Sequence, residues 1–440
     1  MSRTNVQDGE RALTLPEAYR RGVAAAAELA LDIDLTAVLE GNPAVWMATL
    51  GRGQDPVHGG LGLGKGDSEA ARVGALFEAL EHHLSGLSGL DEGRTRIRQA
   101  SAVFREETLR PDVAVNLLGE LPDGPLSCLP YRVVTTGAAI DVPLFLLMPD
   151  YLDEEADSLR ERLGDRYDYS GVSRYSSNNG WASGVDPDEA AVHALNEIIE
   201  RDALSLLLVD QFLGRRTTPL VVIDPRTLPE DLGHLVTAAQ SILGQPLHLI
   251  DMTTDLEVPA ILAYLPAADG QPARVRGCGA SLSRRYAISR SVTELVQVHL
   301  ASEIKNAQGA FSYLAPERRD WTGPYPALHA CYLLDLTSRL PDATVVAYRG
   351  TDAPGSVHEH FSRLIDILTT HGFTPLQRNH YVTGNLAVVN VFVPGLERFV
   401  LVTDGQLVVP GRRGMAVREN GLRPVRPGSP RPEGPQRQLQ

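Results

Sequence analysis

Two stretches of the chain share one design: Gly74-Ala75-Leu76-Phe77-Glu78-Ala79-Leu80-Glu81-His82 and His193-Ala194-Leu195-Asn196-Glu197-Ile198-Ile199-Glu200-Arg201. Each stretch carries two glutamates three residues apart, a spacing that puts both carboxylates on one face of an α-helix. The opposite faces are apolar, through Leu76, Ala79 and Leu80 in the first stretch and through Ala194, Leu195, Ile198 and Ile199 in the second. We therefore predict two helices that each hold a pair of acids in front of an apolar back.

A third stretch carries Arg290, Glu294 and Gln297 on one helical face, with Val292, Leu295 and Val296 behind them. Taken alone, each helix would be an ordinary amphipathic helix with its acids in water. The repetition favours another interpretation, because carboxylates that converge from separate helices are ligands for a hard cation such as Mg²⁺. Nucleotide phosphates can share that metal, while arginine and lysine neutralise the remaining phosphate charge.

The second helix has a clear start signal. Asp186 can cap the helix, Pro187 suits its first position, and Glu189 stands where a capping box places its acid. This signal concerns folding and not chemistry.

Strands alternate with helices over most of the chain. We predict helices over residues 16–31, 68–85, 187–209 and 286–305, and strands over 221–223, 247–250, 260–264, 343–348, 386–392 and 399–402. This order indicates an α/β (α+β) fold with mixed sheets. We divide the chain into an N-terminal helical extension (1–47), a main domain (48–410) and a Pro/Arg-rich C-terminal tail (411–440) without regular structure of its own.

Composition excludes several classes of protein. No apolar run approaches the roughly 18 residues of a membrane-spanning helix, and the residues after Met1 do not form a signal peptide. Three separated cysteines, Cys128, Cys278 and Cys331, argue against a disulfide framework and favour the reducing cytoplasm. The net charge is −14, and the last 30 residues carry seven arginines against two glutamates, so the first 410 residues carry about −19. Such an acidic body is unsuited to nucleic acid.

A glycine-rich segment runs from Gly51 to Gly66 and contains Lys65, one of only two lysines. Residues 59–65 fit the opening of a Walker A loop, GxxxxGK, but Gly66 replaces the Ser or Thr that such a loop uses on Mg²⁺. No clear strand precedes the segment. We therefore interpret it as a flexible loop that places Lys65 near phosphate, with a true P-loop as the alternative.

These blocks resemble the YcaO family of ATP-dependent, amide-activating enzymes. Gly64-Lys65-Gly66 followed by Glu78-x-x-Glu81 is similar to the family's first block, and Asn179-Gly180-Trp181-Ala182-Ser183-Gly184 followed by Glu197-x-x-Glu200-Arg201-Asp202-Ala203 to its second. Arg290-x-x-x-Glu294-x-x-Gln297 is similar to the third block. The resemblance covers roughly residues 48–410 in the family's order, and it implies a YcaO-type fold with a Mg-ATP site.

The resemblance also implies roles for particular residues. Glu78, Glu81, Glu197 and Glu294 become the expected Mg²⁺ ligands. Lys65 and Arg290 become the expected phosphate contacts, Glu200 belongs to the same acidic cluster, and Asn179 and His193 are further nucleotide-site candidates. No residue is assigned as the catalytic acid, base or nucleophile.

The function implied is phosphorylation of a backbone amide oxygen in a ribosomally made precursor peptide. Cyclodehydration of Cys, Ser or Thr to azolines is the leading expectation, and thioamide or amidine formation are the alternatives. Azoline-forming members often end in a Pro-x-Pro-x-Pro tail that enters the active site. Here Pro430-Arg431-Pro432 begins such a pattern, Gly434 breaks it, and a disordered basic end is the competing interpretation.

Departures from the family pattern are Gly74, where many members have Ser, and His82, where Arg commonly follows the second glutamate. No peptide-binding domain is recognisable before the core, so we expect a separate leader-binding or sulfur-delivery partner protein. The family resemblance also makes a homodimer an expectation.

Two other classes of function compete. A silent scaffold for the peptide or a partner enzyme would be expected to lose the metal-binding acids. A ligase or kinase reached by a chance match would turn over ATP with a small molecule and ignore peptides.

The three cysteines and the segment His358–His360 are assigned no role in the chemistry. We interpret the three cysteines as buried packing residues, because none neighbours a group that would lower its pKa. His358 and His360 are two residues apart and cannot share a helix face, so we interpret His358-Glu359-His360 as solvated surface.

Overall fold

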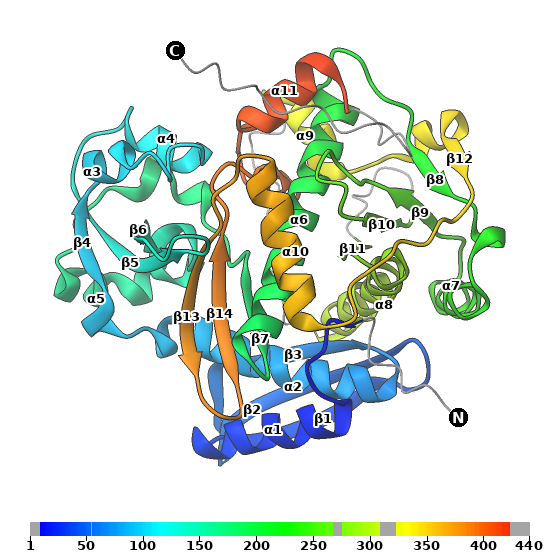
Figure 1. The fold of residues 1–440 in the computed structure, drawn as a ribbon, viewed down its shortest axis with the longest axis horizontal. Coiled ribbons are helices and arrows are strands. Elements are labelled where there is room, and N and C mark those ends of the chain that lie inside the picture. Colours follow the sequence, from blue (N-terminus) through cyan, green and yellow to red (C-terminus); the bar gives the residue numbers. More distant parts are fainter. Residues whose placement is uncertain (1–8, 54, 267–274, 309–322, 423–440) are drawn as a thin grey trace.

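The computed structural model describes residues 9–53, 55–266, 275–308 and 323–422. These residues build three β-sheets with helices packed on and between them (Figure 1). The expected mixed α+β architecture is confirmed.

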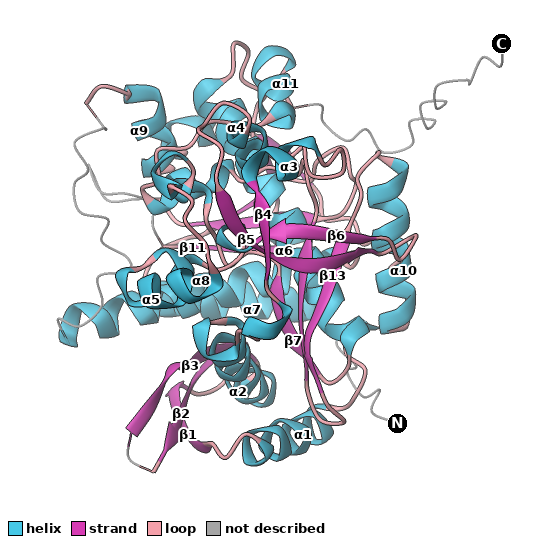
Figure 2. Ribbon diagram, turned by 90° about the vertical axis from the view of Figure 1, so that its left-hand side faces the viewer, coloured by secondary structure: helices cyan, strands magenta, loops and turns pink. Residues whose placement is uncertain are grey.

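The first sheet consists of β1 (Asp32–Leu39), β2 (Ala44–Arg52) and β3 (Asp55–Gly66), all antiparallel. It lies at one end of the molecule with α2 (Ser68–Ser85) packed along one face and α1 (Leu15–Glu28) beside α2 (Figure 2). The predicted boundary between the N-terminal extension and the main domain, at residues 47 and 48, falls within strand β2. Strand β2 pairs with the glycine-rich strand β3, so hydrogen bonds join the N-terminal segment to β3.

Two larger sheets form the rest of the framework. The second has the order β11 (Arg276–Ala280), β10 (Ala260–Tyr264), β9 (His248–Asp251), β8 (Val221–Ile223) and β12 (Thr344–Val346), in which only the β8–β12 pair is parallel. The third is antiparallel, with the order β4 (Arg96–Gln99), β5 (Pro125–Val133), β13 (Leu376–Val382), β14 (Ala387–Phe392) and β7 (Trp181–Gly184), while β6 (Ala139–Pro143) pairs with β5.

Helix α6 (Pro187–Leu208) is the central element between the second and third sheets, because it packs on β7 and β14 and also on β10 and β11 (Figure 1). Helix α8 (Arg284–Gln308) covers β10 and β11, with α7 (Glu230–Leu243) beside it. The other α-helices of the described residues are α3 (Ala100–Arg105), α4 (Val113–Leu118), α5 (Asp157–Leu163), α9 (Pro326–Leu333), α10 (Val357–Thr370) and α11 (Arg412–Asn420).

The glycine-rich segment is a strand and not a flexible loop. Gly62 and Gly64 pair with Ala48 and Trp46 of β2, which excludes the P-loop interpretation. The glycines are there for packing, since a Cβ on Gly64 would lie 1.7 Å from the carbonyl oxygen of Ala71, and one on Gly62 2.3 Å from that of Ala75. Sequence propensity hides this strand because glycine is depleted in strands.

The same close approach recurs under α8. A Cβ on Gly277 would lie 2.0 Å from the carbonyl oxygen of Ser291, and one on Gly279 2.3 Å from that of Ala287. Helix α6 also lies close to its own preceding strand, although less tightly, since a Cβ on Gly184 would lie 2.8 Å from the amide nitrogen of Ala190. Each glutamate-bearing helix therefore folds back onto the glycine-containing strand that precedes it.

Most of the predicted elements are present with small shifts of their ends. The predicted helices correspond to α1, α2, α6 and α8, and the predicted strands over 221–223, 247–250, 260–264, 343–348 and 386–392 correspond to β8, β9, β10, β12 and β14. Asp186 caps α6 as expected, since its carboxylate accepts a hydrogen bond from the amide of Glu189 at 2.9 Å.

Two further predictions of secondary structure were wrong. The apolar run 399–402 is a buried 3₁₀ helix, Phe399–Asp404, because a short buried run carries no periodicity that separates strand from helix. The tail after Gly411 begins with α11, whose first amides at Gly411 and Gly414 donate to the carboxylate of Glu397 at 2.8 and 2.7 Å. Arg413 adds ion pairs to Asp202 and Asp255, so tertiary contacts stabilise a helix that local propensity does not predict. The Pro430–Pro432 motif lies outside the described residues.

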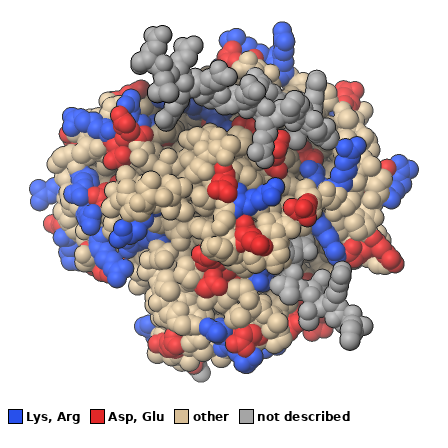
Figure 3. Space-filling model, viewed as in Figure 1, with Lys and Arg blue, Asp and Glu red and all other residues tan. Residues whose placement is uncertain are grey.

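On the face seen in Figure 3, acidic side chains lie among basic ones, and the basic side chains gather toward the left edge of the view. None of the described helices is long and apolar enough to cross a membrane.

The close packing under α8 gives a stability prediction. We expect Gly277→Ala to lower the free energy of unfolding by about 2–4 kcal/mol, since the added methyl group must push the α8 backbone off β11. The control is Gly233→Ala in α7, where a Cβ meets nothing within 4 Å and alanine favours the helix. Chemical denaturation measures both variants, and equal stability of the two would contradict the packing argument.

Candidate functional site

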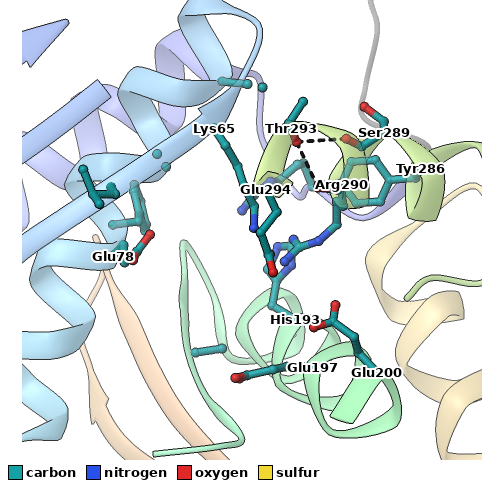
Figure 4. A pocket seen from close by; sticks show the side chains of 18 of the residues that line it. Lys65, Glu78, His193, Glu197, Glu200, Tyr286, Ser289, Arg290, Thr293 and Glu294 are labelled. Atoms are coloured by element: carbon teal, nitrogen blue, oxygen red, sulfur yellow. Dashed lines mark hydrogen bonds and ion pairs between the residues drawn. The ribbon is translucent and has the colours of Figure 1, made fainter. Parts of the chain in front are cut away.

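A cavity of about 570 Å³ lies between α2, α6 and α8. Eight of the nine residues predicted for the site line it: Lys65, Glu78, Glu81, His193, Glu197, Glu200, Arg290 and Glu294. Figure 4 shows Lys65 reaching in from β3, Glu78 from α2, Glu197 and Glu200 from α6, and Arg290 and Glu294 from α8. Asn179 is the predicted residue that does not line the cavity, whereas its neighbour Asn178 does.

The three helices present their acids in one register. Glu78, Glu197 and Glu294 are each the eleventh residue of their helix, counted from Ser68, Pro187 and Arg284. Each helix also starts on a capping side chain that accepts a hydrogen bond from the third helical amide: Asp67 from Ala70 at 2.9 Å, Asp186 from Glu189 at 2.9 Å and Ser283 from Tyr286 at 3.2 Å. In each of three units, a strand is followed by a capping residue and a helix, and the acid stands at the same position of the helix. The three units thus bring their carboxylates to one cavity.

Lys65 and Glu294 form an ion pair across the cavity wall, between β3 and α8. The second carboxylate oxygen of Glu294 accepts a hydrogen bond from the amide of Cys278 at 3.2 Å. Burial alone would raise the pKa of Glu294, but the adjacent Lys65 ammonium and its hydrogen bond lower it below the usual value. Glu294 is therefore ionised and held in place from both sides.

Glu197 and Glu200 share the guanidinium of Arg201, which lies 3.7 and 4.0 Å from their respective carboxylates. The amide of Gly180 also donates to Glu197, at 3.3 Å. Even so, burial raises the pKa of Glu197, and burial together with the charge of Glu294 raises the pKa of Glu200 to about 7. One arginine does not offset the cost of enclosing both acids.

The acids of α2 are in a similar state. Burial raises the pKa of Glu78 above its usual value. For Glu81, burial and the neighbouring charges of Glu78 and Glu197 raise the pKa to about 8, although His82 opposes the shift. The cavity therefore contains more carboxylate charge than its own cations compensate.

Several polar atoms at the cavity are buried without a hydrogen-bond partner among the described residues. They include Nε2 of His193 and Nε of Arg290. Oδ1 of Asn179, the neighbour of the cavity-lining Asn178, is also buried without such a partner. Burial, followed by the charges of Arg11 and Arg290, lowers the pKa of His193 well below its usual value, so its imidazole is neutral. A ligand with both anionic and hydrogen-bonding groups would satisfy these atoms.

The donor set fits Mg²⁺ held together with phosphate. Within the described ranges, no three His, Cys, Asp or Glu side chains are close enough to enclose a metal ion by themselves. Mg²⁺ is ordinarily bound by one or two carboxylates plus substrate phosphates and waters, and not by an all-protein cage. Paired carboxylates beside Lys65 and Arg290 match that arrangement.

Sequence reasoning missed part of the lining. Arg201, Tyr286, Ser289 and Thr293 also line the cavity, and they lie on the same helices as the predicted acids. A helical wheel could have found them, since Arg201 lies four residues after Glu197 and Tyr286 four before Arg290. Figure 4 shows the Thr293 hydroxyl turned back onto its own helix, where it donates to the carbonyls of Ser289 and Arg290 at 2.9 and 3.1 Å. Arg11 also lines the cavity, and it belongs to none of the sequence motifs that predict the site.

The structure confirms the predictions for the three cysteines and for His358, but not the one for His360. Cys128, Cys278 and Cys331 are buried free thiols with raised pKa, as expected of packing residues. His358 is a surface residue 3.0 Å from Asp188, as expected. The interpretation of His360 was wrong, because this residue is fully buried beside Glu10, on the apolar side of an amphipathic helix.

Comparison with known proteins agrees with this geometry. Residues 63–397 match the YcaO family, which is described as YcaO cyclodehydratases that bind ATP and Mg²⁺. An uncharacterized protein in the tfuA 3′ region of Rhizobium leguminosarum bv. trifolii is 28% identical over 265 residues, which is 58% of this chain and 59% of that protein. An uncharacterized protein of Methanothermobacter thermautotrophicus is 34% identical over 127 residues, 28% of this chain and 31% of that protein. The match thus spans less than two thirds of the length of either relative.

Solved structures share the fold at low sequence identity. YcaO from Methanopyrus kandleri, bound with AMPPCP and Mg²⁺, superposes with a TM-score of 0.64 at 18% identity over 92% of this chain and 97% of that one. A heterocyclase in complex with substrate and cofactor gives 0.60 at 17% identity over 90% and 53%, and the Escherichia coli microcin synthetase McbBCD complex gives 0.53 at 12% over 84% and 88%. Because the family match covers most of the chain, this protein belongs to the YcaO family, whose members bind ATP and Mg²⁺.

Proposed function

We propose that this chain uses ATP to phosphorylate the oxygen of a peptide backbone amide. The substrate is a ribosomally made precursor peptide, and the product is an azoline formed from a Cys, Ser or Thr residue. The observation that supports the proposal is the meeting of five glutamates from three helices at one cavity, together with Lys65 and Arg290.

The carboxylates of Glu78, Glu81, Glu197 and Glu294 would hold Mg²⁺, and Glu200 would complete the acidic cluster. Bound Mg²⁺ supplies screening of the phosphate charge. Lys65 and Arg290 lie on the same cavity wall as Glu294 and would contact the phosphates. Neutral His193 is suited to a hydrogen bond with the nucleotide and not to an ionic contact. The role of Asn179 stays a prediction.

The proposed reaction needs positioning more than covalent participation of the protein. The peptide side chain adds to the preceding carbonyl carbon and loses its proton, and the resulting oxyanion takes the γ-phosphoryl group of ATP with release of ADP. Loss of inorganic phosphate and of the amide proton then leaves the C=N bond of the azoline. Phosphate is a better leaving group than hydroxide, so the protein chiefly orients the reactants and screens charge.

The partners are part of the proposal. A separate protein would deliver the precursor peptide, or sulfur in the thioamide alternative, and a homodimer is the proposed assembly. The Rhizobium relative is named for its position beside tfuA, which makes a tfuA product a suitable partner to include in assays.

The acidic cavity also weighs against the competing scaffold function. A protein that only holds a peptide has no use for buried acids whose pKa values are raised, because such groups reduce stability. A ligase or kinase that acts on a small molecule would use the same kind of ATP site. It differs from the proposed function in its substrate, which is not a peptide.

Removal of one acid tests the nucleotide site. We expect Glu197→Gln to bind Mg-ATP at least about tenfold more weakly than the parent, because a charged ligand becomes a neutral amide of the same shape. Isothermal titration calorimetry with ATP and Mg²⁺ measures the change. The matched control is Glu69→Gln, an exposed acid in the first turn of α2, which should bind as the parent does. Equal affinity of Glu197→Gln and the parent would contradict the assignment of the cavity.

The reaction is tested with candidate precursor peptides, ATP and the partner protein. We expect the peptide to lose one water for each azoline formed, with one ADP released, as measured by mass spectrometry and an ADP assay. Exchange of oxygen for sulfur would favour the thioamide alternative. ATP turnover that ignores peptides would contradict the proposal in favour of a small-molecule ligase or kinase.

A further inference from the structure

Residues Gly9–Ala12, called here the N-terminal strap, lie far from the nucleotide motifs in sequence but reach their cavity in the fold. The strap precedes the residues that match the family. Gly9 adopts a φ of +81°, and a Cβ there would lie 2.6 Å from the carbonyl oxygen of Pro354. The strap is thereby pressed against the segment that leads into α10, where the dark blue ribbon of Figure 1 ends.

Glu10 anchors the strap beneath α6. Its carboxylate is fully buried and accepts hydrogen bonds from Asn196, at 3.1 Å, and from the hydroxyl of Ser281. His360 of α10 lies 3.7 Å from the same carboxylate. Glu10 thus ties the strap to α6, to the loop before α8 and to α10.

Arg11 is held by Glu189, which the sequence analysis places in the capping box of α6. Its Nη1 lies 2.8 Å from Oε1 of Glu189, whose side chain is 3% exposed, and the amide of Ala12 donates to Oε2 of Glu189 at 3.2 Å. The predicted capping-box acid therefore positions the strap. Arg11 itself is 23% exposed and lines the cavity.

The charges around Arg11 point to an anion. Arg11 and Arg290 both lie near the neutral imidazole of His193, and both lower its pKa. Arg290 is directed into the cavity beside His193 in Figure 4, and its Nε has no hydrogen-bond partner among the described residues. Arg11 is already paired with Glu189, and Glu200 and Glu294 lie near Arg290, but the two guanidiniums also repel each other. A phosphate group in contact with both would remove that repulsion.

We propose that Arg11 contacts the polyphosphate of the nucleotide together with Arg290, so that the N-terminal strap completes the ATP site. This inference rests on the proposed function, because it takes the cavity as the Mg-ATP site. It adds a phosphate-binding residue from a segment outside the family match and gives Glu189 the role of a positioning residue.

The test compares Mg-ATP and Mg-free AMP binding by calorimetry in the parent, Arg11→Met and the double variant Arg11→Met/Glu189→Gln. Methionine keeps the aliphatic part of the side chain but removes the charge. The double variant also removes the carboxylate that would otherwise be buried unpaired, so it separates loss of contact from loss of stability. Arg20→Met, which removes a 72% exposed arginine from α1, controls for the change in net charge.

We expect both Arg11 variants to bind Mg-ATP at least about tenfold more weakly than the parent and Arg20→Met, with a smaller loss for AMP, while the double variant melts within a few degrees of the parent. Arg11→Lys should recover part of the affinity. Mg-ATP binding by the double variant equal to that of the parent would overturn the role of Arg11 alone. An equal loss for AMP and ATP would also overturn it, because the strap would then act only on the shape of the site. No binding by the parent would instead overturn the proposed function, and this inference with it.

Discussion

The close contact between each glutamate-bearing helix and the glycine strand before it is the interaction on which the rest of the structure depends. Gly64 and Gly277 leave no room for a Cβ, which would lie 1.7 and 2.0 Å from carbonyl oxygens of α2 and α8. A helix fixed at that distance and capped at a fixed residue has a fixed rotation and register. As a result, the eleventh residue of α2, α6 and α8 points into the same cavity, although these helices are far apart in the sequence.

This arrangement concentrates negative charge where the fold cannot neutralise it. Burial and mutual repulsion raise the pKa of Glu81 to about 8 and that of Glu200 to about 7, and each raised pKa means that the charged form reduces the stability of the ligand-free protein. The apolar clusters behind the three helices offset this cost, since Leu76, Leu195 and Leu295 are fully buried. A bound cation and the phosphates it carries would convert the same carboxylates from a source of repulsion into a binding site.

The parts of the fold that sequence could predict are those governed by local rules. Helices α2 and α6 follow from apolar periodicity, and α6 also from capping by Asp186, so their limits were predicted within one residue. Strand β3 was missed because its glycines serve packing against α2, which is a tertiary requirement. Helix α11 was missed for a related reason, since the carboxylate of Glu397 and the ion pairs of Arg413 stabilise it from outside its own sequence.

The candidate site follows the same division. Its acids repeat at helical spacing and could be found, whereas Arg11 reaches the cavity only because buried Glu10 and Glu189 hold the strap in place. The ion pair between Lys65 and Glu294 joins β3 to α8 and was likewise invisible in the sequence.

The most direct test of the central claim, that acids of three helices bind metal together with the nucleotide, is anomalous X-ray scattering from crystals grown with Mn²⁺ and AMPPCP. We predict metal peaks between α2, α6 and α8, within about 2.1 Å of carboxylate oxygens from more than one helix and of phosphate oxygens. Peaks that contact only the acids of a single helix, or nucleotide bound elsewhere on the protein, would contradict the account.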